Sequence, residues 1–307
     1  MKHISKILFY ADGAEHESSA LESTIKMSDS LAAEVTVADV VARVSTNDTN
    51  PAVIKAINAL QDTLKNERKK FLDQLAKPYK DRQNLRTEIL AGKDYLELIR
   101  KVKTEGIDLL VKAVNTPTAL SKAFFGEADI KLLRKCPCPV WIMKPSSSGK
   151  MKKIVATVDP LDPEHRELNA AIVDMASFLA SKDGSELLLL GCWKVPFDHS
   201  LESKLDSAKL TRIREGLVSQ CHQNLDNLVS RVKGQSVKKV LLEGRAGDLI
   251  PEFAEKEEID LVVMGTLARI GIPGMIIGNT AEKVIHTIQS SVLAVKPEGF
   301  VIPDIAD

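Results

Sequence analysis

The chain has 307 residues, 44% of them hydrophobic, and its 42 basic residues balance 42 acidic residues to give a formal net charge of zero. This length favours two domains of ordinary size, each large enough to bury its own core. The charge balance argues against an electrostatic footprint for nucleic acid or for an anionic membrane surface, so we expect neither a nucleic-acid partner nor membrane insertion.

The first half of the chain alternates short apolar runs with amphipathic stretches, a pattern typical of parallel strands joined by helical crossovers. It predicts strands at residues 6–10, 34–41, 85–90, 108–113 and 139–143, with helices between them. A long helical pattern at residues 51–77 carries apolar residues at three- and four-residue steps. We expect this helix to cover one face of the sheet.

The second half repeats this order after a short polar linker at residues 145–150. It predicts strands at residues 153–157, 186–192, 238–242, 260–264 and 291–295, and a long helix at residues 203–232. Most of the predicted strands are continuously apolar, as sheets covered on both faces require. We therefore predict two α/β domains, residues 1–146 and 151–307, each an open five-stranded parallel sheet with helices on both faces.

The two halves match each other in register. A shift of 152 positions places Gly92, residues 107–109 and Gly126 on Gly244, residues 259–261 and Gly278. Near the start of each half, residues 6–12 match residues 153–159 at a shift of 147, which indicates a five-residue insertion in the second copy. A repeat of about half the chain indicates a duplicated domain rather than a solenoid.

The positions where ligands bind in such sheets lie beyond the carboxyl ends of the strands. This rule selects Asp12 and Asp159, which follow the first strands of the two copies. It also selects the loops that follow Ala113 and Met264. We expect each aspartate and the loop of the same copy to face one crevice.

The loop of the second copy carries the features of an anion site. It begins at Gly265 and ends at Gly278, Asn279 and Thr280, where a helical pattern starts. Glycine lets the backbone approach a ligand closely, and the free N–H groups of a helix start favour an anion such as phosphate. Asn279 or Thr280 can cap this helix and also donate to a phosphate oxygen. The alternative is an ordinary glycine-bearing connection before a capped helix.

The same residues carry a resemblance to a known family. Gly265, Ala268, Gly278 and Asn279 stand where the universal stress protein family has its G-x2-G-x9-G-[ST] nucleotide-binding loop, and Asp159 stands where that family has an aspartate after its first strand. With its two copies, the whole chain resembles a tandem universal stress protein of the E type. The resemblance implies the strand order 3-2-1-4-5 in each domain and a role in surviving stress rather than a defined catalytic step.

The resemblance implies a nucleotide site of the ATP type in the second copy. The ligand contacts that we expect come from Asp159, Cys192, Gly265, Ala268, Gly278, Asn279 and Thr280. Two of these positions depart from the family pattern, because Ala268 replaces the second glycine and Asn279 replaces the usual hydroxyl, although an Asn side chain can still donate a hydrogen bond. No cofactor follows from the residues themselves, and the resemblance points to ATP with Mg²⁺.

The first copy departs further from the pattern, with Asp12, Ala113, Gly126 and Glu127 at the matching positions. Ala113 replaces a motif glycine, and Glu127 puts a carboxylate where phosphate would bind. Glu127 also suits a structural role, as an acidic residue in a first turn that the helix dipole stabilises. We therefore expect a degenerate site that scaffolds or binds something uncharged.

The remaining candidates for chemistry predict neither a catalytic nor a metal site. Cys136 and Cys138 lack Cys-x-x-Cys spacing and a second ligand pair, and the six histidines are dispersed. Four cysteines are too few for a disulfide framework. Since no apolar run approaches the roughly 20 residues of a membrane span and Met1 leads straight into a strand rather than a signal peptide, we expect a cytoplasmic protein.

These patterns favour a cytoplasmic stress-response protein that binds a nucleotide or a related small ligand in its second domain without rapid turnover. The alternatives are a carrier of a non-nucleotide, amphiphilic ligand and a protein-interaction platform whose loops stay empty of ATP. A slow ATPase is a further hypothesis. We also expect the two domains to associate as an intramolecular pseudo-dimer through their last strands, because fusion raises the effective concentration of each for the other; a homodimer of the chain is left open.

Overall fold

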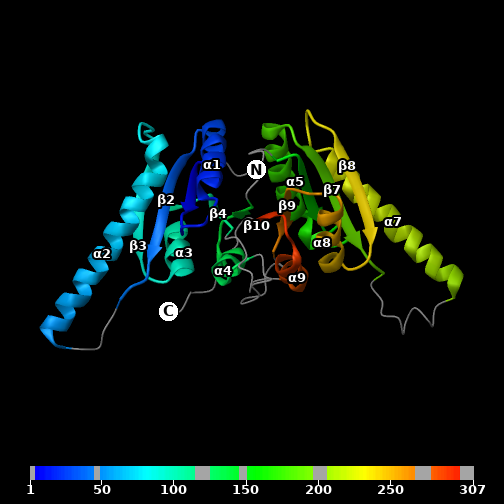
Figure 1. Ribbon diagram of the computed structural model, residues 1–307. Coiled ribbons are helices and arrows are strands. Elements are labelled where there is room, and N and C mark those ends of the chain that lie inside the picture. Colours follow the sequence, from blue (N-terminus) through cyan, green and yellow to red (C-terminus); the bar gives the residue numbers. More distant parts are fainter. Residues whose placement is uncertain are drawn as a thin grey trace. The chain divides into compact units, whose positions relative to one another are not determined.

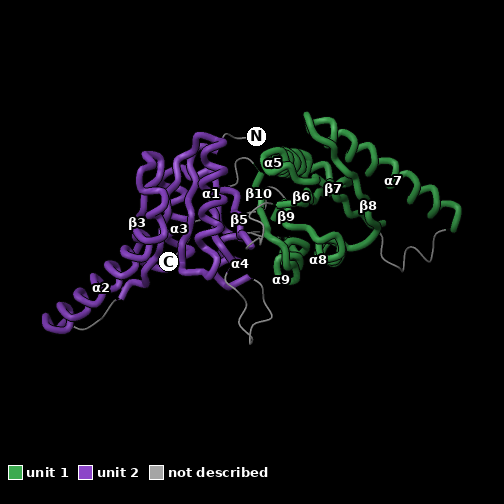
Figure 2. Tube along the Cα trace, turned by 45° about the horizontal axis from the view of Figure 1, so that its top comes forward, with its two compact units in different colours: residues 1, 146–301 green, residues 2–145, 302–307 purple. Residues whose placement is uncertain are grey.

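The computed structural model describes residues 4–44, 49–114, 125–144, 151–195, 206–266 and 278–297. The chain divides into two compact units, an N-terminal unit of residues 2–145 and a C-terminal unit of residues 146–301 (Figure 2). The predicted pseudo-dimer concerns the placement of one unit on the other and stays a prediction.

The N-terminal unit is a five-stranded parallel sheet with helices on both faces (Figure 1). Its elements are β1 (Lys6–Tyr10), α1 (Glu17–Leu31), β2 (Glu34–Val41), α2 (Pro51–Ala76), a 3-10 turn (Lys77–Tyr79), β3 (Leu85–Ala91), α3 (Asp94–Glu105), β4 (Leu109–Ala113), α4 (Glu127–Lys135) and β5 (Val140–Met143). The strand order is β3-β2-β1-β4-β5, and every pair is parallel. The predicted order is therefore confirmed.

The C-terminal unit repeats this architecture (Figure 1). Its elements are β6 (Lys153–Val158), a 3-10 turn (Pro163–His165), α5 (Arg166–Asp183), β7 (Glu186–Trp193), α7 (Ser207–Val229), β8 (Val237–Glu243), α8 (Ala246–Lys256), β9 (Leu261–Gly265), α9 (Asn279–Thr287) and β10 (Ser291–Val295). The strand order is β8-β7-β6-β9-β10, again parallel throughout. In both units the predicted strands are confirmed, and their ends differ from the predicted ones by at most one residue.

The crossovers decide which helices share a face. The chain adds strands first on one side of the central strand and then on the other side. Because the connections are right-handed, the first two helices lie on one face of the sheet and the last two lie on the opposite face. In the N-terminal unit α3 accordingly packs on α4, and in the C-terminal unit α5 packs on α7 and α8 packs on α9. The central strands are buried from both sides, as Leu8, Phe9, Leu188 and Leu190 show with 0% exposure.

The same aspartate contact recurs in both units at the start of the first strand. The Oδ2 atom of Asp108 accepts hydrogen bonds from the backbone N–H groups of residues 5–6 at 2.9 and 3.1 Å. The Oδ2 atom of Asp260 does the same for residues 152–153 at 2.6 and 2.9 Å. Each aspartate thereby joins the start of the fourth strand to the start of the first, and this shared role explains why residues 107–109 and 259–261 match in the sequence.

Two glycines are matched because the backbone requires them. Gly92 follows β3 with φ of +152°, and Gly244 follows β8 with φ of +146°, conformations that L side chains rarely adopt. Their N–H groups donate to the ends of the neighbouring strands, to the carbonyl oxygen of Val41 at 2.9 Å and to that of Trp193 at 2.8 Å. The chain turns from an edge strand into the next helix at both places.

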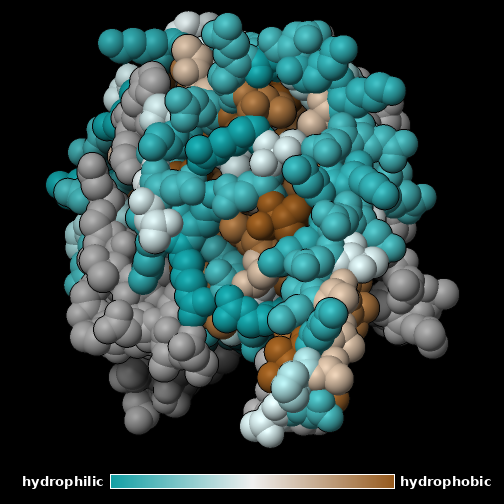
Figure 3. All heavy atoms as spheres, turned by 90° about the vertical axis from the view of Figure 1, so that its left-hand side faces the viewer, coloured by the Kyte–Doolittle hydropathy of each residue, from teal (hydrophilic) through white to brown (hydrophobic). Residues whose placement is uncertain are grey.

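The two long helices cover their sheets only in part. In α2 the buried residues are Leu72 and Ala76, both in the last turns, and in α7 all buried residues lie after residue 220. The first turns of α2 run beyond the sheet and carry the half-exposed Ile54 and Leu60 (Figure 1). Apolar areas on this side of the unit are small and bordered by hydrophilic side chains (Figure 3). The prediction that these helices cover a face is thus right for their carboxyl-terminal parts.

The end of α7 differs from the prediction. The helix begins at Ser207 and ends at Val229, three residues before the predicted end, and Ser230 closes it with N–H bonds back to the last turn. Residues 203–205, where the predicted helix begins, lie outside the described part of the chain. Within the described residues, every helix is too short or too polar to cross a bilayer.

Candidate functional site

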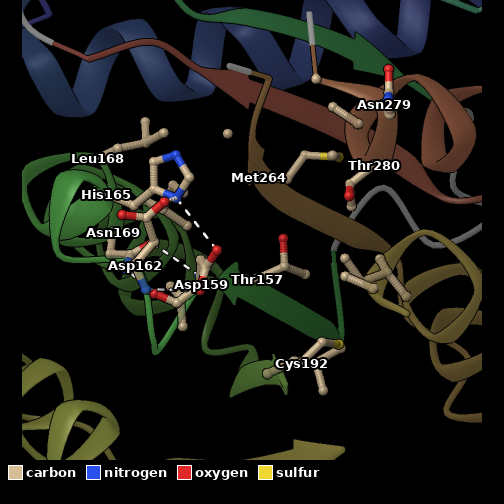
Figure 4. Close-up of a pocket in the computed structure, with 18 residues that line it drawn as sticks. Thr157, Asp159, Asp162, His165, Leu168, Asn169, Cys192, Met264, Asn279 and Thr280 are labelled. Carbon is tan, nitrogen blue, oxygen red and sulfur yellow. Dashed lines mark hydrogen bonds and ion pairs between the residues drawn. The ribbon is translucent and has the colours of Figure 1, made fainter. Parts of the chain in front are cut away.

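The C-terminal unit holds a pocket at the carboxyl ends of its central strands. The chain leaves β6 toward β7 on one side, whereas β9 pairs with β6 on the other side, so the strand order reverses between β6 and β9. Ligands of open α/β sheets bind at such a reversal. The cavity has a volume of about 440 Å³, and β6, β7, β9, α5, α8 and the start of α9 supply its walls (Figure 4).

Most of the residues predicted from the sequence meet in this pocket. Its lining includes Asp159, Cys192, Gly265, Gly278, Asn279 and Thr280. Ala268 lies outside the described residues. The structure therefore brings six of the seven positions together, while their contact with a nucleotide stays a prediction.

Asp159 is held in place by the loop that follows β6. Its Oδ1 atom accepts hydrogen bonds from the backbone N–H groups of Leu161 and Asp162 at 3.0 and 3.2 Å. Burial alone would raise the pKa of Asp159, but the His165 side chain and the two backbone N–H groups outweigh it and lower this pKa. The carboxylate is consequently a fixed negative charge at the edge of the pocket.

A buried asparagine on α5 fixes the backbone of this loop. The Nδ2 group of Asn169 donates to the carbonyl oxygen of Asp159 at 2.7 Å, and its Oδ1 atom accepts from the N–H of Asp159 at 3.2 Å. From the other side, Nδ2 of Asn224 donates to the carbonyl oxygen of Pro160 at 2.7 Å. The pocket edge is thereby joined to both α5 and α7, neither of which the sequence analysis placed at the site.

The start of α9 provides the anion-favouring wall. Gly278 is the N-cap, with φ of −79° and ψ of 147°, and makes no side-chain capping bond. The prediction that Asn279 or Thr280 caps this helix is wrong, because these exposed residues are its first two helical residues. The first residues of α9 line the pocket and no side chain caps them, so an anion in the pocket can accept from N–H groups of this first turn.

Thr266, directly after β9, is joined to the start of this helix and is supported by a buried lysine. The N–H of Gly278 donates to the carbonyl oxygen of Thr266 at 2.9 Å, and the Nζ group of Lys296 donates to the Thr266 hydroxyl. Thr266 and Lys296 are both buried. The end of β9, the start of α9 and the end of β10 are thereby held together.

Gly265 is needed for packing rather than for an unusual backbone angle. A Cβ atom at this position would lie 2.7 Å from Cδ2 of Leu168, a residue of α5 that also lines the pocket. Any side chain here would push Leu168 out of its place. The absence of a side chain at Gly265 therefore leaves room for α5.

Cys192 contributes a neutral thiol to the pocket wall. Burial, together with the charge of Asp159, raises the pKa of Cys192 to about 12. The nucleophilic thiolate form is therefore scarce at neutral pH. Near it, the hydroxyl of Thr157 donates to the carbonyl oxygen of Val263 at 3.3 Å, so this side chain is also part of the fold.

The matching place in the N-terminal unit is filled by charged side chains of the chain itself. The Nζ group of Lys112 lies 2.9 Å from Asp129 Oδ1 and 3.0 Å from Asp12 Oδ2, and it donates to the carbonyl oxygen of Ala113 at 3.2 Å. Lys112 and Asp129 are each 1% exposed. Burial alone would lower the pKa of Lys112, but the two aspartates outweigh it and raise this pKa, so the ammonium group stays charged.

The sequence analysis missed this ion triad, although the repeat contains the signal. At the shift of 152, Lys112 corresponds to Met264 and Asp129 corresponds to Ala281, and both of these line the C-terminal pocket. The two copies therefore differ by a complementary pair of charges at two pocket positions. A comparison of the copies at buried positions, rather than at the glycines alone, would have found it.

The carboxylate at the start of α4 is also a different one from that predicted. Glu127 is exposed, and its side chain forms an ion pair with Lys131 one turn later, which also lowers the pKa of Glu127. Asp129 instead turns back to the helix start, where its Oδ2 atom accepts from the N–H of Gly126 at 2.9 Å. The place that an anion would take at this helix is thus occupied by Asp129 rather than only flanked by Glu127.

Comparisons with known proteins agree with this architecture. The sequence model of the Universal stress protein family matches residues 3–144 and again residues 150–296. Universal stress protein E of Photorhabdus laumondii is 29% identical over 217 residues, which are 69% of this chain and 68% of that protein. Universal stress protein E of Escherichia coli K12 is 29% identical over 210 residues, 67% of this chain and 66% of that protein.

Solved structures show the same likeness over nearly the whole chain. A Pseudomonas aeruginosa structure described as a universal stress protein has a TM-score of 0.70 and 26% identity, and the match covers 96% of this chain and 94% of that one. A universal stress protein from Archaeoglobus fulgidus has a TM-score of 0.64 and 16% identity, with 96% and 99% covered, which shows the fold. The two family matches, one on each unit, show that this chain belongs to the universal stress protein family and carries its domain twice in tandem.

Proposed function

We propose that the C-terminal unit binds a nucleotide with an ATP-like phosphate chain and holds it without rapid turnover. The observation that carries the proposal is the difference between the two units at the same place in the fold. Where the N-terminal unit has Asp129 and Lys112, the C-terminal unit has Ala281 and Met264, and a cavity of about 440 Å³ lies there. A helix start without a side-chain cap faces that cavity.

The lining suggests which part of the nucleotide lies where. We expect the phosphates at the start of α9, where Gly278 lets the backbone approach closely and Asn279 and Thr280 offer N–H groups and side-chain donors. On the opposite wall, Asp159 is a carboxylate with which ribose hydroxyls can hydrogen bond. Apolar side chains, including those of Ile172 and Leu190, are suited to the base. Mg²⁺ would enter with the phosphates.

Binding without turnover agrees with the state of the side chains in the described lining. Cys192 is a protonated thiol at neutral pH, and the Thr157 hydroxyl is engaged with a backbone carbonyl. Asp159 carries a lowered pKa, which makes it a weak base. These groups suit recognition of a ligand better than activation of a water molecule.

The test is the thermal stability of the whole protein with and without millimolar ATP and Mg²⁺. A ligand that binds only the folded state raises the stability of that state. Gly278→Val should abolish this rise, because it places a branched side chain at the phosphate end of the pocket. Gly126→Val is the matched control, since Gly126 is likewise an N-cap with extended backbone, at φ of −74° and ψ of 169°. It should leave the rise unchanged.

Two outcomes would contradict the proposal. If ATP, ADP and AMP all fail to shift the melting temperature of the unaltered chain, the nucleotide interpretation fails, and the carrier or interaction-platform hypothesis takes its place. If Gly126→Val removes the shift and Gly278→Val does not, the wrong unit has been chosen. Phosphate release that persists in Gly278→Val would come from a contaminating ATPase.

A further inference from the structure

Three side chains with metal-binding atoms converge beside the pocket, in the loop that follows β6. They are Asp159, Asp162 and His165, and one ligand atom from each lies within 4.8 Å of the other two (Figure 4). The Nδ1 atom of His165 lies 3.5 Å from Asp159 Oδ2 and 3.7 Å from Asp162 Oδ2. The sequence analysis predicted no metal site, because these residues follow none of the spacings that it considered.

The two carboxylates are oriented so that one oxygen of each remains for a further ligand. Asp159 uses Oδ1 for the backbone N–H groups of residues 161–162, and Asp162 uses Oδ1 for the backbone N–H of Glu164 at 2.9 Å. In both cases Oδ2 is the atom that faces His165. The backbone therefore fixes the direction of both carboxylates before any ion arrives.

The spacing of these atoms fits a small tetrahedral ion. Bonds of about 2.0–2.2 Å from Zn²⁺ to nitrogen and oxygen, at tetrahedral angles, place two ligand atoms about 3.3–3.6 Å apart. The two separations from His165 Nδ1 are 3.5 and 3.7 Å, and all three ligand atoms lie within 4.8 Å of one another, so the imidazole lies at or just beyond the required separation from each carboxylate oxygen. Octahedral Mg²⁺, with shorter ligand separations and a demand for oxygen ligands, fits this set less well.

We propose that Asp159 Oδ2, Asp162 Oδ2 and His165 Nδ1 form a site for one divalent transition-metal ion of the Zn²⁺ or Co²⁺ type. Two carboxylates and one neutral imidazole neutralise the charge of the ion, and three protein ligands leave the fourth position for water or for a bound molecule. All three residues also line the pocket, so the ion would lie at its wall. The site goes beyond the proposed nucleotide function and does not depend on it.

The experiment uses the full chain, stripped of metal with a chelator and free of nucleotide. Calorimetric titration with Zn²⁺ should give one site per chain, and Co²⁺ should give the visible absorption of a tetrahedral nitrogen and oxygen site. Asp162→Asn keeps an Oδ1 atom for the N–H of Glu164 but replaces the ligand oxygen with an amide group. This variant and His165→Gln should each weaken Zn²⁺ binding at least about tenfold.

His222→Gln is the matched control, because His222 is an exposed histidine on α7 of the same unit. It should bind Zn²⁺ as the unaltered chain does. Binding that survives in both Asp162→Asn and His165→Gln would overturn the proposal, as would the intense near-ultraviolet bands of a thiolate–Co²⁺ complex or the absence of any bound Zn²⁺. Because ATP is absent from these titrations and Zn²⁺ is absent from the thermal-shift assay, failure of one proposal leaves the other standing.

Discussion

Replacing Lys112 with methionine, the residue of the other copy, tests how strongly the ion triad is coupled. In Lys112→Met the carboxylate of Asp129, 1% exposed, loses its cation and keeps, among the described residues, the hydrogen bond from the N–H of Gly126. Leaving such a charge unpaired in the interior costs about 3–5 kcal/mol of unfolding free energy. Asp129→Ala alone leaves Lys112 with Asp12, so this variant should also lower the free energy of unfolding, but by less.

The double variant Lys112→Met/Asp129→Ala recreates the pair that the C-terminal unit already uses. The buried carboxylate of Asp129 is then removed together with its cation, and the carboxylate that loses Lys112 is that of the more exposed Asp12, so the double variant should lose less stability than Lys112→Met alone. We expect a coupling energy of about 2–3 kcal/mol, at the upper end of the range for residues in direct contact.

The two tryptophans of the chain make this measurable unit by unit. Trp141 is buried in β5 of the N-terminal unit, and Trp193 is buried in β7 of the C-terminal unit. In a Trp193→Phe background, the fluorescence change in a urea titration reports the unfolding of the N-terminal unit through Trp141, which avoids treating two units as one transition. The reasoning is refuted if the effects of the two single substitutions simply add.

Other expected outcomes concern a buried carboxyl group and two glycines. Burial raises the pKa of Glu17 from 4.5 to about 7. Between pH 4.5 and pH 7 the folded state therefore holds a proton that the unfolded chain releases. The free energy of unfolding should fall as pH rises through this range, by up to about 1.4 kcal/mol per pH unit. Glu17→Gln should flatten that slope in urea titrations from pH 5 to 8, and an unchanged slope would contradict the assignment. Gly265→Ala, with its methyl group 2.7 Å from Leu168 Cδ2, should cost about 1–3 kcal/mol. Gly216→Ala, in open space on α7, should gain about 0.5–1 kcal/mol, and calorimetry that finds the same sign for both would exclude this account.

The sheets could be predicted from the sequence because burial on both faces leaves a simple trace. A strand such as Leu187 to Leu190 is apolar at every position, and it is followed by an amphipathic stretch that only a helical crossover explains. The long pattern of α2 was harder to interpret. Its apolar periodicity continues into turns that have no sheet beneath them, and periodicity alone does not show where a helix leaves its support.

The sequence predicts those residues of the site whose place is fixed by the order of strands and helices. Asp159 follows β6 directly and Gly278 is the N-cap of α9, the helix that follows β9, so topology fixes their place in the crevice. Lys112 stands inside an apolar strand, where it reads as an isolated charge until Asp129, 17 positions later, is brought beside it by α4. Asp162 and His165 lie in an irregular loop and a 3-10 turn, where no period links their side chains.

The ion triad also limits how the duplicated chain can change further. If both copies began with an open crevice, the N-terminal one became closed through two substitutions that now depend on each other. Returning Lys112 alone to methionine leaves the buried Asp129 carboxylate without its cation, whereas returning Asp129 first leaves Lys112 paired with Asp12, so the two orders of reversal differ in cost. The closed crevice thereby resists a reversal that begins at Lys112, whereas the pocket of the C-terminal unit has no such pair of charges at the matching positions.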